Sequence, residues 1–222
     1  TAMGVFASLA SGLSVPLASA MGLGWRWSLG VWAIPALLAI CLWFYLQTIT
    51  PSNNPGESDS PKGKNRMLTS LLAWQVALFF GFQSTLFYVT ITWLPEILVS
   101  KGFTAEKAGW LLSFLQLVGL PASFIIPVLA GRFRNQQGLV LALGLLSACG
   151  YGILWFSASG MWTLISIVAI GFSLNGSFGL GLSMLAMRAR TSRDSSELSG
   201  MAQSVGYFIS AVGPFLVGYL FD

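Results

Sequence analysis

Residues 135–187 read NQQGLVLALGLLSACGYGILWFSASGMWTLISIVAIGFSLNGSFGLGLSMLAM, and no side chain in this stretch carries a charge. A transmembrane helix needs roughly 20 predominantly apolar residues, so the stretch has room for two such helices. Ser157-Ala158-Ser159-Gly160 divides it and is typical of a turn. In hydrocarbon the backbone must satisfy its own hydrogen bonds, which favours helices. The stretch therefore predicts membrane-spanning helices at 138–157 and 161–187.

The rest of the chain repeats this pattern of charge-free runs between short charged segments. Only 8% of the residues are charged, against about 25% in soluble proteins. The remaining runs predict five further helices, at 3–20, 27–46, 70–94, 108–131 and 198–221. The sequence thus predicts an all-α protein, a polytopic transmembrane helical bundle.

The basic residues divide unevenly between the two sides of the membrane that seven alternating spans define. Eight of them fall in segments on one side and three on the other. Loops rich in Lys and Arg face the cytoplasm, so segments 47–67, 132–137 and 188–197 are predicted to be cytoplasmic. Because the basic residues lie in short interhelical loops, the net charge of +4 does not indicate a nucleic-acid partner.

A polar, proline-rich segment at 51–61 divides the predicted helices into two groups. Two helices lie within 1–46, a linker covers 47–67, and five helices lie within 68–222. The first and last helices both carry small residues or proline at every fourth position, with Pro16 matching Pro214. This match is either a coincidence, since small residues let many membrane helices approach closely, or an internal repeat. A repeat would mean that the chain is cut at both ends from a longer protein of two halves.

The residue types that catalysis and metal binding need are absent from the predicted spans. The chain has no His, and no predicted span contains Asp or Glu. Cys41 and Cys149 both fall inside spans, where they are predicted to be small buried apolar residues. We therefore expect no enzyme, cofactor or metal site. Proton coupling would need a titratable group within the membrane, so a coupling carboxylate is expected on helices outside this chain.

Three motifs indicate a family. They are Leu72-Ala73-Trp74-Gln75-Val76, Trp93-Leu94-Pro95-Glu96-Ile97-Leu98 and Leu198-Ser199-Gly200-Met201-Ala202-Gln203-Ser204-Val205-Gly206-Tyr207. With the order of two helices, linker and second helical group, they resemble the cyanate porter branch of the major facilitator superfamily. That branch includes bacterial cyanate and 2-nitroimidazole transporters. The resemblance implies a twelve-helix protein, of which this chain supplies the seven helices 5 to 11.

The resemblance also implies a function. It is secondary active transport of a small polar or anionic solute, such as a cyanate-like anion or a nitroimidazole-like compound, by import or efflux. Two helical bundles would rock about a central site, in the bacterial inner membrane. The full-length protein would be a monomer, with proton coupling as one option. The alternative is a non-transporting polytopic membrane sensor or a membrane enzyme.

Polar side chains at membrane depth are the candidates for substrate binding, because they are costly in lipid unless paired or facing a water-filled cavity. The resemblance implies a central cavity lined by helices 70–94, 108–131, 161–187 and 198–221. Each candidate also has a structural interpretation, as a packing or hydrogen-bond contact between helices. The candidates on these helices are Gln83, Tyr88, Gln116, Asn175, Gln203 and Tyr207.

Four further residues are candidates for gating. Trp93 is predicted to close the outer mouth of the cavity, and Pro121 would bend its helix. Gly131-Arg132-Phe133-Arg134 resembles a degenerate copy of the basic loop of the family. The copy lacks the acidic residue and the full basic cluster, so a gating role for Arg132 and Arg134 rests on two charges alone.

Overall fold

The computed structural model describes residues 8–13, 26, 30–49, 70–133, 135–157, 160–188 and 192–221. Within these ranges the chain is helical apart from short turns and connections, which confirms the predicted all-α class. The helices with defined bounds are α3 (Ala33–Ile49), α4 (Leu71–Ser100), α5 (Ala105–Arg132), α6 (Gln137–Phe156), α7 (Met161–Arg188) and α8 (Ser192–Phe221).

In the described part of the chain, five helices are long and apolar enough to cross a membrane, namely α4 to α8. They match five of the seven predicted spans. The other two, 3–20 and 27–46, are described only in part. Residues 8–13 are helical, and α3 is apolar but shorter than the five spans.

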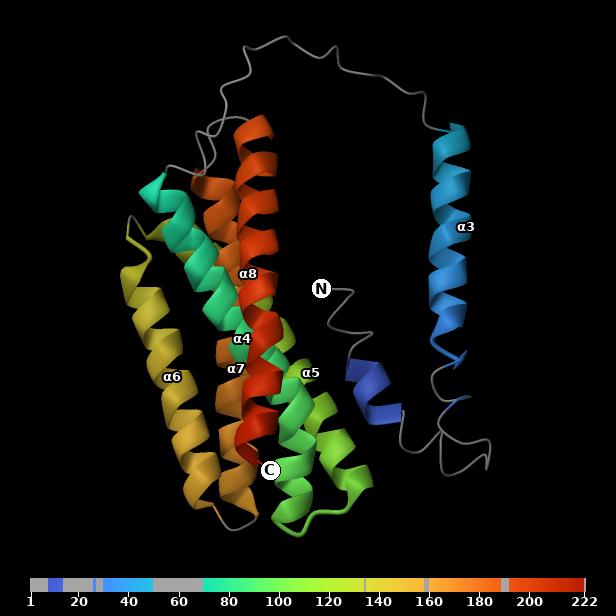
Figure 1. Cartoon of the computed structure of the whole chain (residues 1–222), viewed down its shortest axis with the longest axis vertical. Coiled ribbons are helices and arrows are strands. Elements are labelled where there is room, and N and C mark those ends of the chain that lie inside the picture. The colour runs from blue at the N-terminus through green and yellow to red at the C-terminus, as the bar shows by residue number, and fades with distance from the viewer. Residues whose placement is uncertain are drawn as a thin grey trace.

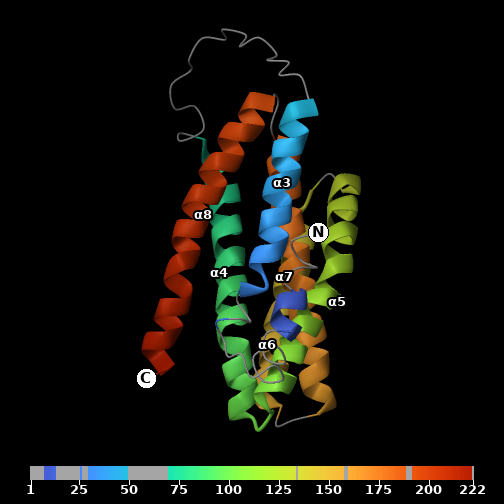
Figure 2. The same cartoon turned by 90° about the vertical axis from the view of Figure 1, so that its right-hand side faces the viewer.

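Helices α4 to α8 lie side by side in one bundle (Figure 1). Helix α6 forms one edge of the bundle in that view, and α8 forms an edge when the molecule is turned by 90° (Figure 2). Helix α7 packs against α4, α5, α6 and α8 and is therefore central to the bundle. Helix α3 stands apart in Figure 1, and none of its residues is buried.

The contact between α5 and α7 runs through small residues. A Cβ atom added to Gly171 would lie 2.3 Å from the carbonyl oxygen of Leu115. One added to Gly119 would lie 2.0 Å from the side-chain nitrogen of Asn175. Lipid is as apolar as the helices, so close backbone approach and van der Waals contact stabilise the pair. Packing therefore requires glycine at both positions.

The contact between α4 and α8 follows the same principle. A Cβ atom on Gly206 would lie 2.9 Å from the ring of Phe80, and one on Gly213 would lie 2.5 Å from the methyl group of Thr85. Towards the end of α4, the indole Nε1 of Trp93 donates a hydrogen bond to the carbonyl oxygen of Pro214 at 3.2 Å. The two helices are thus joined by close packing and by the hydrogen bond from Trp93 to Pro214.

Several predicted helix boundaries were wrong, because the helices extend beyond the charge-free runs. Helix α4 continues to Ser100, α5 begins at Ala105 after its N-cap Thr104, and α8 begins at Ser192. The segments 95–107 and 188–197 are therefore largely helical where the structure describes them, not loops. A charged side chain ends an apolar run but not a helix, since the charge can reach water while the backbone bonds continue.

The predicted helix 27–46 is displaced towards the C-terminus, because α3 begins at Ala33 and continues to Ile49. The prediction that both cysteines are buried was also wrong. Cys41 and Cys149 are free and exposed. An apolar side chain on a membrane helix can face lipid, so an apolar neighbourhood in the sequence does not imply burial in protein.

We expect Gly171→Ala to lower the thermal stability of the purified protein in detergent. The added methyl would have to displace the backbone of α5 at Leu115, and such overpacking typically costs about 1–3 kcal/mol. Gly144→Ala on α6 is the matched control, since a Cβ atom there meets nothing within 4 Å. Equal unfolding midpoints for the two variants would contradict the close contact between α5 and α7.

Candidate functional site

Four aromatic side chains from three helices form a continuous chain of contacts, the aromatic cluster. Phe80 and Tyr88 lie on α4, Phe178 on α7 and Tyr207 on α8. The ring centroids are 5.8 Å apart for Phe80 and Phe178, 5.6 Å for Phe80 and Tyr207, and 6.3 Å for Tyr88 and Tyr207. These separations are typical of favourable aromatic pairs. The cluster therefore fixes the two tyrosines next to each other.

The aromatic cluster is buried at one end and open at the other. Phe80 is 1% exposed, whereas Tyr88 and Tyr207 are 38% and 39% exposed. A tyrosine in this position presents a flat ring face together with a hydroxyl group that can donate and accept hydrogen bonds. The open end, the tyrosine pair Tyr88 and Tyr207, can therefore contact a small ligand through both ring and hydroxyl.

Gln83 lies inside the bundle and not on this open surface. It is 5% exposed, and its Nε2 donates to the carbonyl oxygen of Leu174 on α7 at 3.4 Å. Its Oε1 accepts a hydrogen bond from the hydroxyl of Ser84 at 3.2 Å. Both polar atoms of the amide are thus engaged, which favours the structural interpretation of Gln83 as a link between α4 and α7.

Gln116 is likewise buried in a contact between helices. Its Nε2 donates to the hydroxyl of Ser11 at 2.9 Å. One turn earlier, the hydroxyl of Ser113 donates to the carbonyl oxygen of Ser8 at 2.7 Å. These bonds join α5 to the helical residues 8–13, which precede the linker. Gln116 therefore helps to hold the two predicted groups of helices together.

Asn175 and Gln203 each donate a hydrogen bond within their own helix. The Nδ2 of Asn175 reaches the carbonyl oxygen of Gly171 at 3.0 Å, and this side chain fills the notch at Gly119. The Nε2 of Gln203 reaches the hydroxyl of Ser199 at 2.8 Å. Asn175 thus has a packing role between α5 and α7. Gln203 is half-buried one turn before Tyr207, so it lies close to the open tyrosine pair along α8.

The gating candidates do not form one group. Trp93 is tied to α8 by its bond to Pro214. Pro121 and Arg132 are exposed on α5, and α5 continues as a helix through Pro121. Arg134 lies outside the described residues. Of the three gating candidates that the structure describes, Trp93 is the one with a hydrogen bond to α8, the helix that carries Tyr207.

Two members of the aromatic cluster, Phe80 and Phe178, were missed because the sequence was examined for polar side chains. The available signal was spacing. Phe80 and Tyr88 are eight residues apart and so share a helix face, and Phe178 follows Asn175 by three.

A contact between Thr90 on α4 and Tyr151 on α6, whose hydroxyl oxygens lie 2.5 Å apart, was also missed.

Within the described ranges, no group of three His, Cys, Asp or Glu side chains is placed to hold a metal ion.

The described helices α4 to α8 form a membrane-spanning bundle, and the exposed tyrosine pair on α4 and α8 is neutral and aromatic. A model of the Major Facilitator Superfamily matches residues 1–214, so the chain belongs to this family of transporters. The family indicated by the three sequence motifs is confirmed.

Named relatives include transporters from two bacteria. The chain is 41% identical over 228 residues to an uncharacterized transporter, YycB, of Bacillus subtilis (strain 168), covering 100% of this chain and 54% of that protein. It is 36% identical over 222 residues to the 2-nitroimidazole transporter of Escherichia coli (strain K12), covering 99% and 55%. It is 24% identical over 198 residues to the cyanate transport protein CynX of the same strain, covering 88% and 50%. The chain spans about half the length of these relatives. No solved structure matches the chain significantly.

We expect Gln83→Leu to lower thermal stability without weakening substrate affinity, because Gln83 joins α4 to α7 inside the bundle. A hydrogen bond between membrane helices contributes about 0.6 kcal/mol on average. Gln75→Leu is the matched control, since Gln75 is exposed on the same helix. Thermal unfolding in detergent and transport kinetics of the full-length protein would be measured together. A tenfold rise in KM with an unchanged midpoint would instead place Gln83 in the substrate path.

Proposed function

We propose that the full-length protein is a secondary active transporter of a small polar or anionic solute, working by alternating access. Family membership and the names of the relatives support transport as the class of function. The substrate proposed here is either a cyanate-like anion or a nitroimidazole-like compound. Both are small, and both carry hydrogen-bond acceptors.

The tyrosine pair is the observation that carries this proposal. Several polar side chains of the described spans donate to a neighbouring helix or to their own helix, as Gln83, Gln116 and Asn175 do. Tyr88 and Tyr207, by contrast, are more than a third exposed, come from two different helices and lie in ring contact. We assign them to the wall of the substrate path, with Gln203 beside them on α8.

The proposed mechanism uses neutral groups on this half of the path. A tyrosine hydroxyl can donate to the oxygen or nitrogen of an anion and to a nitro group, and releases it easily because no ion pair has to be broken. A cationic anchor or a coupling carboxylate would then lie on helices outside this chain. The helices on the two sides of the linker would rock about this path.

The proposed setting is the bacterial inner membrane. Arg132 ends α5, Arg188 ends α7, and Arg193 lies at the start of α8. Because consecutive helices alternate in direction, these three helix ends lie on the same side of the membrane. The bias of basic residues supports a cytoplasmic position for that side. We therefore propose that the linker is cytoplasmic and divides the N-terminal group of helices from the C-terminal group. Its predicted start at residue 47 was too early, because α3 continues to Ile49.

Flux measurements on the full-length protein in proteoliposomes test the proposal. We expect concentration-dependent, saturable movement of cyanate or of 2-nitroimidazole. Tyr207→Phe and Tyr88→Phe should raise the KM for cyanate about tenfold, because a hydrogen bond to a charged group contributes about 1.5–3 kcal/mol. Tyr219→Phe is the control, since Tyr219 lies on α8 with 83% exposure, outside the aromatic cluster.

The outcomes separate the alternatives. Equal KM values for all three variants would remove the tyrosine pair from the substrate path while leaving transport intact. Absence of flux for every small anion and nitroaromatic compound tried, in a protein that unfolds cooperatively, would contradict transport and favour a membrane sensor.

A further inference from the structure

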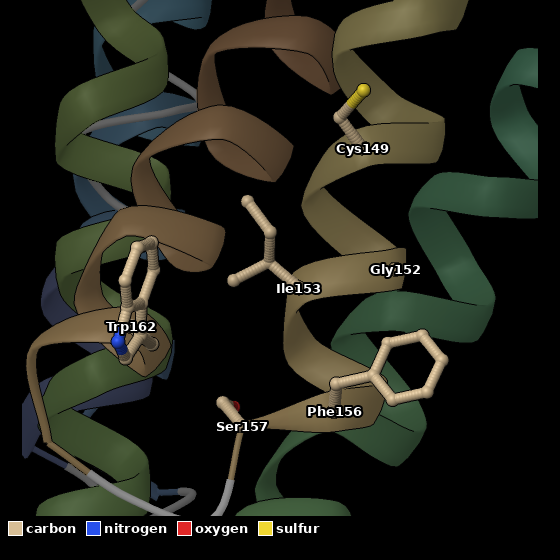
Figure 3. A pocket seen from close by; sticks show the side chains of 6 residues that line it. All are labelled: Cys149, Gly152, Ile153, Phe156, Ser157 and Trp162. Atoms are coloured by element: carbon tan, nitrogen blue, oxygen red, sulfur yellow. The ribbon is translucent and has the colours of Figure 1, made fainter.

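An apolar groove lies between α6 and α7, near the segment that connects them (Figure 3). Its volume is about 520 Å³. Among the lining residues, Ser157 is the one with a side-chain hydroxyl. That hydroxyl already has hydrogen-bond partners, the carbonyl oxygen of Leu154 at 3.2 Å and the hydroxyl of Thr163 at 3.3 Å. A polar solute would therefore find little to bind. The residues that line the groove are Cys149, Gly152, Ile153, Phe156, Ser157 and Trp162.

The groove follows the direction of the helices. Cys149, Gly152 and Phe156 lie on successive turns of α6, so the groove runs from the end of the helix towards its middle (Figure 3). Ile153 and Trp162 face each other across the space between α6 and α7. In a membrane-spanning bundle, this is the direction in which lipid acyl chains lie.

The end of the groove has the composition of a membrane interface. Trp155, Phe156 and Trp162 are 82%, 87% and 59% exposed. Exposed Trp side chains gather at the headgroup level of a bilayer, where the ring meets lipid and the indole N–H meets water. The groove therefore opens at headgroup depth and continues into the hydrocarbon region.

A cation contacts Ser157, one of the residues that line the groove. The Nζ of Lys101, at the end of α4, donates to the carbonyl oxygen of Ser157 at 2.6 Å, and Ser157 lines the groove. An ammonium group has three donors, so two remain for another acceptor. A lysine at headgroup depth attracts anionic lipids over zwitterionic ones. The apolar groove matches the acyl chain of a lipid, and the ammonium group of Lys101 matches an anionic headgroup.

We propose that this groove binds an anionic phospholipid. One acyl chain lies along Cys149, Gly152 and Ile153, and the phosphate group of the lipid accepts hydrogen bonds from Lys101. The site is separate from the aromatic cluster on α4, α7 and α8, and it does not depend on which solute is transported. The site requires a ligand with a long apolar chain and a headgroup of net negative charge.

Quenching of tryptophan fluorescence by brominated lipids tests the proposal on the full-length protein in vesicles. The lipids are phosphatidylglycerol and phosphatidylcholine with brominated acyl chains, and the difference between the native protein and Trp162→Phe isolates the signal of Trp162. We expect brominated phosphatidylglycerol to bind at Trp162 about fivefold more tightly than the zwitterionic lipid, the size of one lysine contact.

The headgroup contact is tested at Lys101. Lys101→Gln should bring the relative binding of the two lipids close to equal. Lys107→Gln is the matched control and should keep the preference, because Lys107 is exposed on α5 after the same connecting segment and does not line the groove. A preference that survives Lys101→Gln, or no preference in the native protein, would overturn the assignment of an anionic headgroup.

The acyl-chain contact is tested at Gly152. A Cβ atom there meets nothing within 4 Å, so Gly152→Leu fills the groove without disturbing the helix. It should reduce the quenching of Trp162 by either lipid, whereas Gly144→Leu, at another uncrowded glycine of α6, should not. Quenching that is equal in the two variants would overturn the proposal. So would a Trp162 that no brominated lipid quenches, since the groove would then be covered by protein.

Discussion

Close approach of helix backbones is the constraint on which the rest of the structure depends. Lipid offers the spans no hydrophobic reason to associate, so they associate where small residues let them touch. Gly119 and Gly171 bring α5 against α7, and Gly206 and Gly213 bring α4 against α8. These contacts determine where every other side chain of the bundle can lie.

The same contacts decide which polar side chains are buried between helices and which stay exposed. A polar side chain that falls in a close contact is buried and must bond there, because an unpaired polar group in a membrane is costly. Gln83 and Gln116 meet this requirement through bonds to Leu174 and Ser11. Gly206 lets α8 approach Phe80, which places Tyr207 beside Tyr88 at the edge of the contact. The open tyrosine pair is thus a consequence of how α4 and α8 pack.

The fold could be predicted from the sequence because charge-free runs of sufficient length have one stable form in a membrane. The ends of the helices could not, since Ser192 and Ala105 begin helices within charged segments. Tyr88 and Tyr207 were predicted separately, and packing between helices brings them together. The sequence could not show that Asn175 and Gln83 are buried while Tyr88 and Tyr207 are exposed. A polar residue in a membrane helix can lie in a contact between helices or in a cavity, and the sequence looks the same in both cases. The exposure of Cys149 was missed because an apolar residue in a membrane helix can face lipid instead of packing against protein.

The central claim is that the tyrosine pair faces a water-filled path while the neighbouring surface of α8 faces lipid. Reactivity of introduced cysteines with a charged thiol reagent tests it most directly, in full-length protein carrying Cys41→Ser and Cys149→Ser. Phe208→Cys is the reference, because Phe208 follows Tyr207 in the chain and is 79% exposed on another face of α8. The proposal predicts that Tyr207→Cys reacts with the reagent, that substrate slows this reaction, and that Phe208→Cys stays unreactive. Equal lack of reaction at both positions, with the protein intact, would contradict the claim.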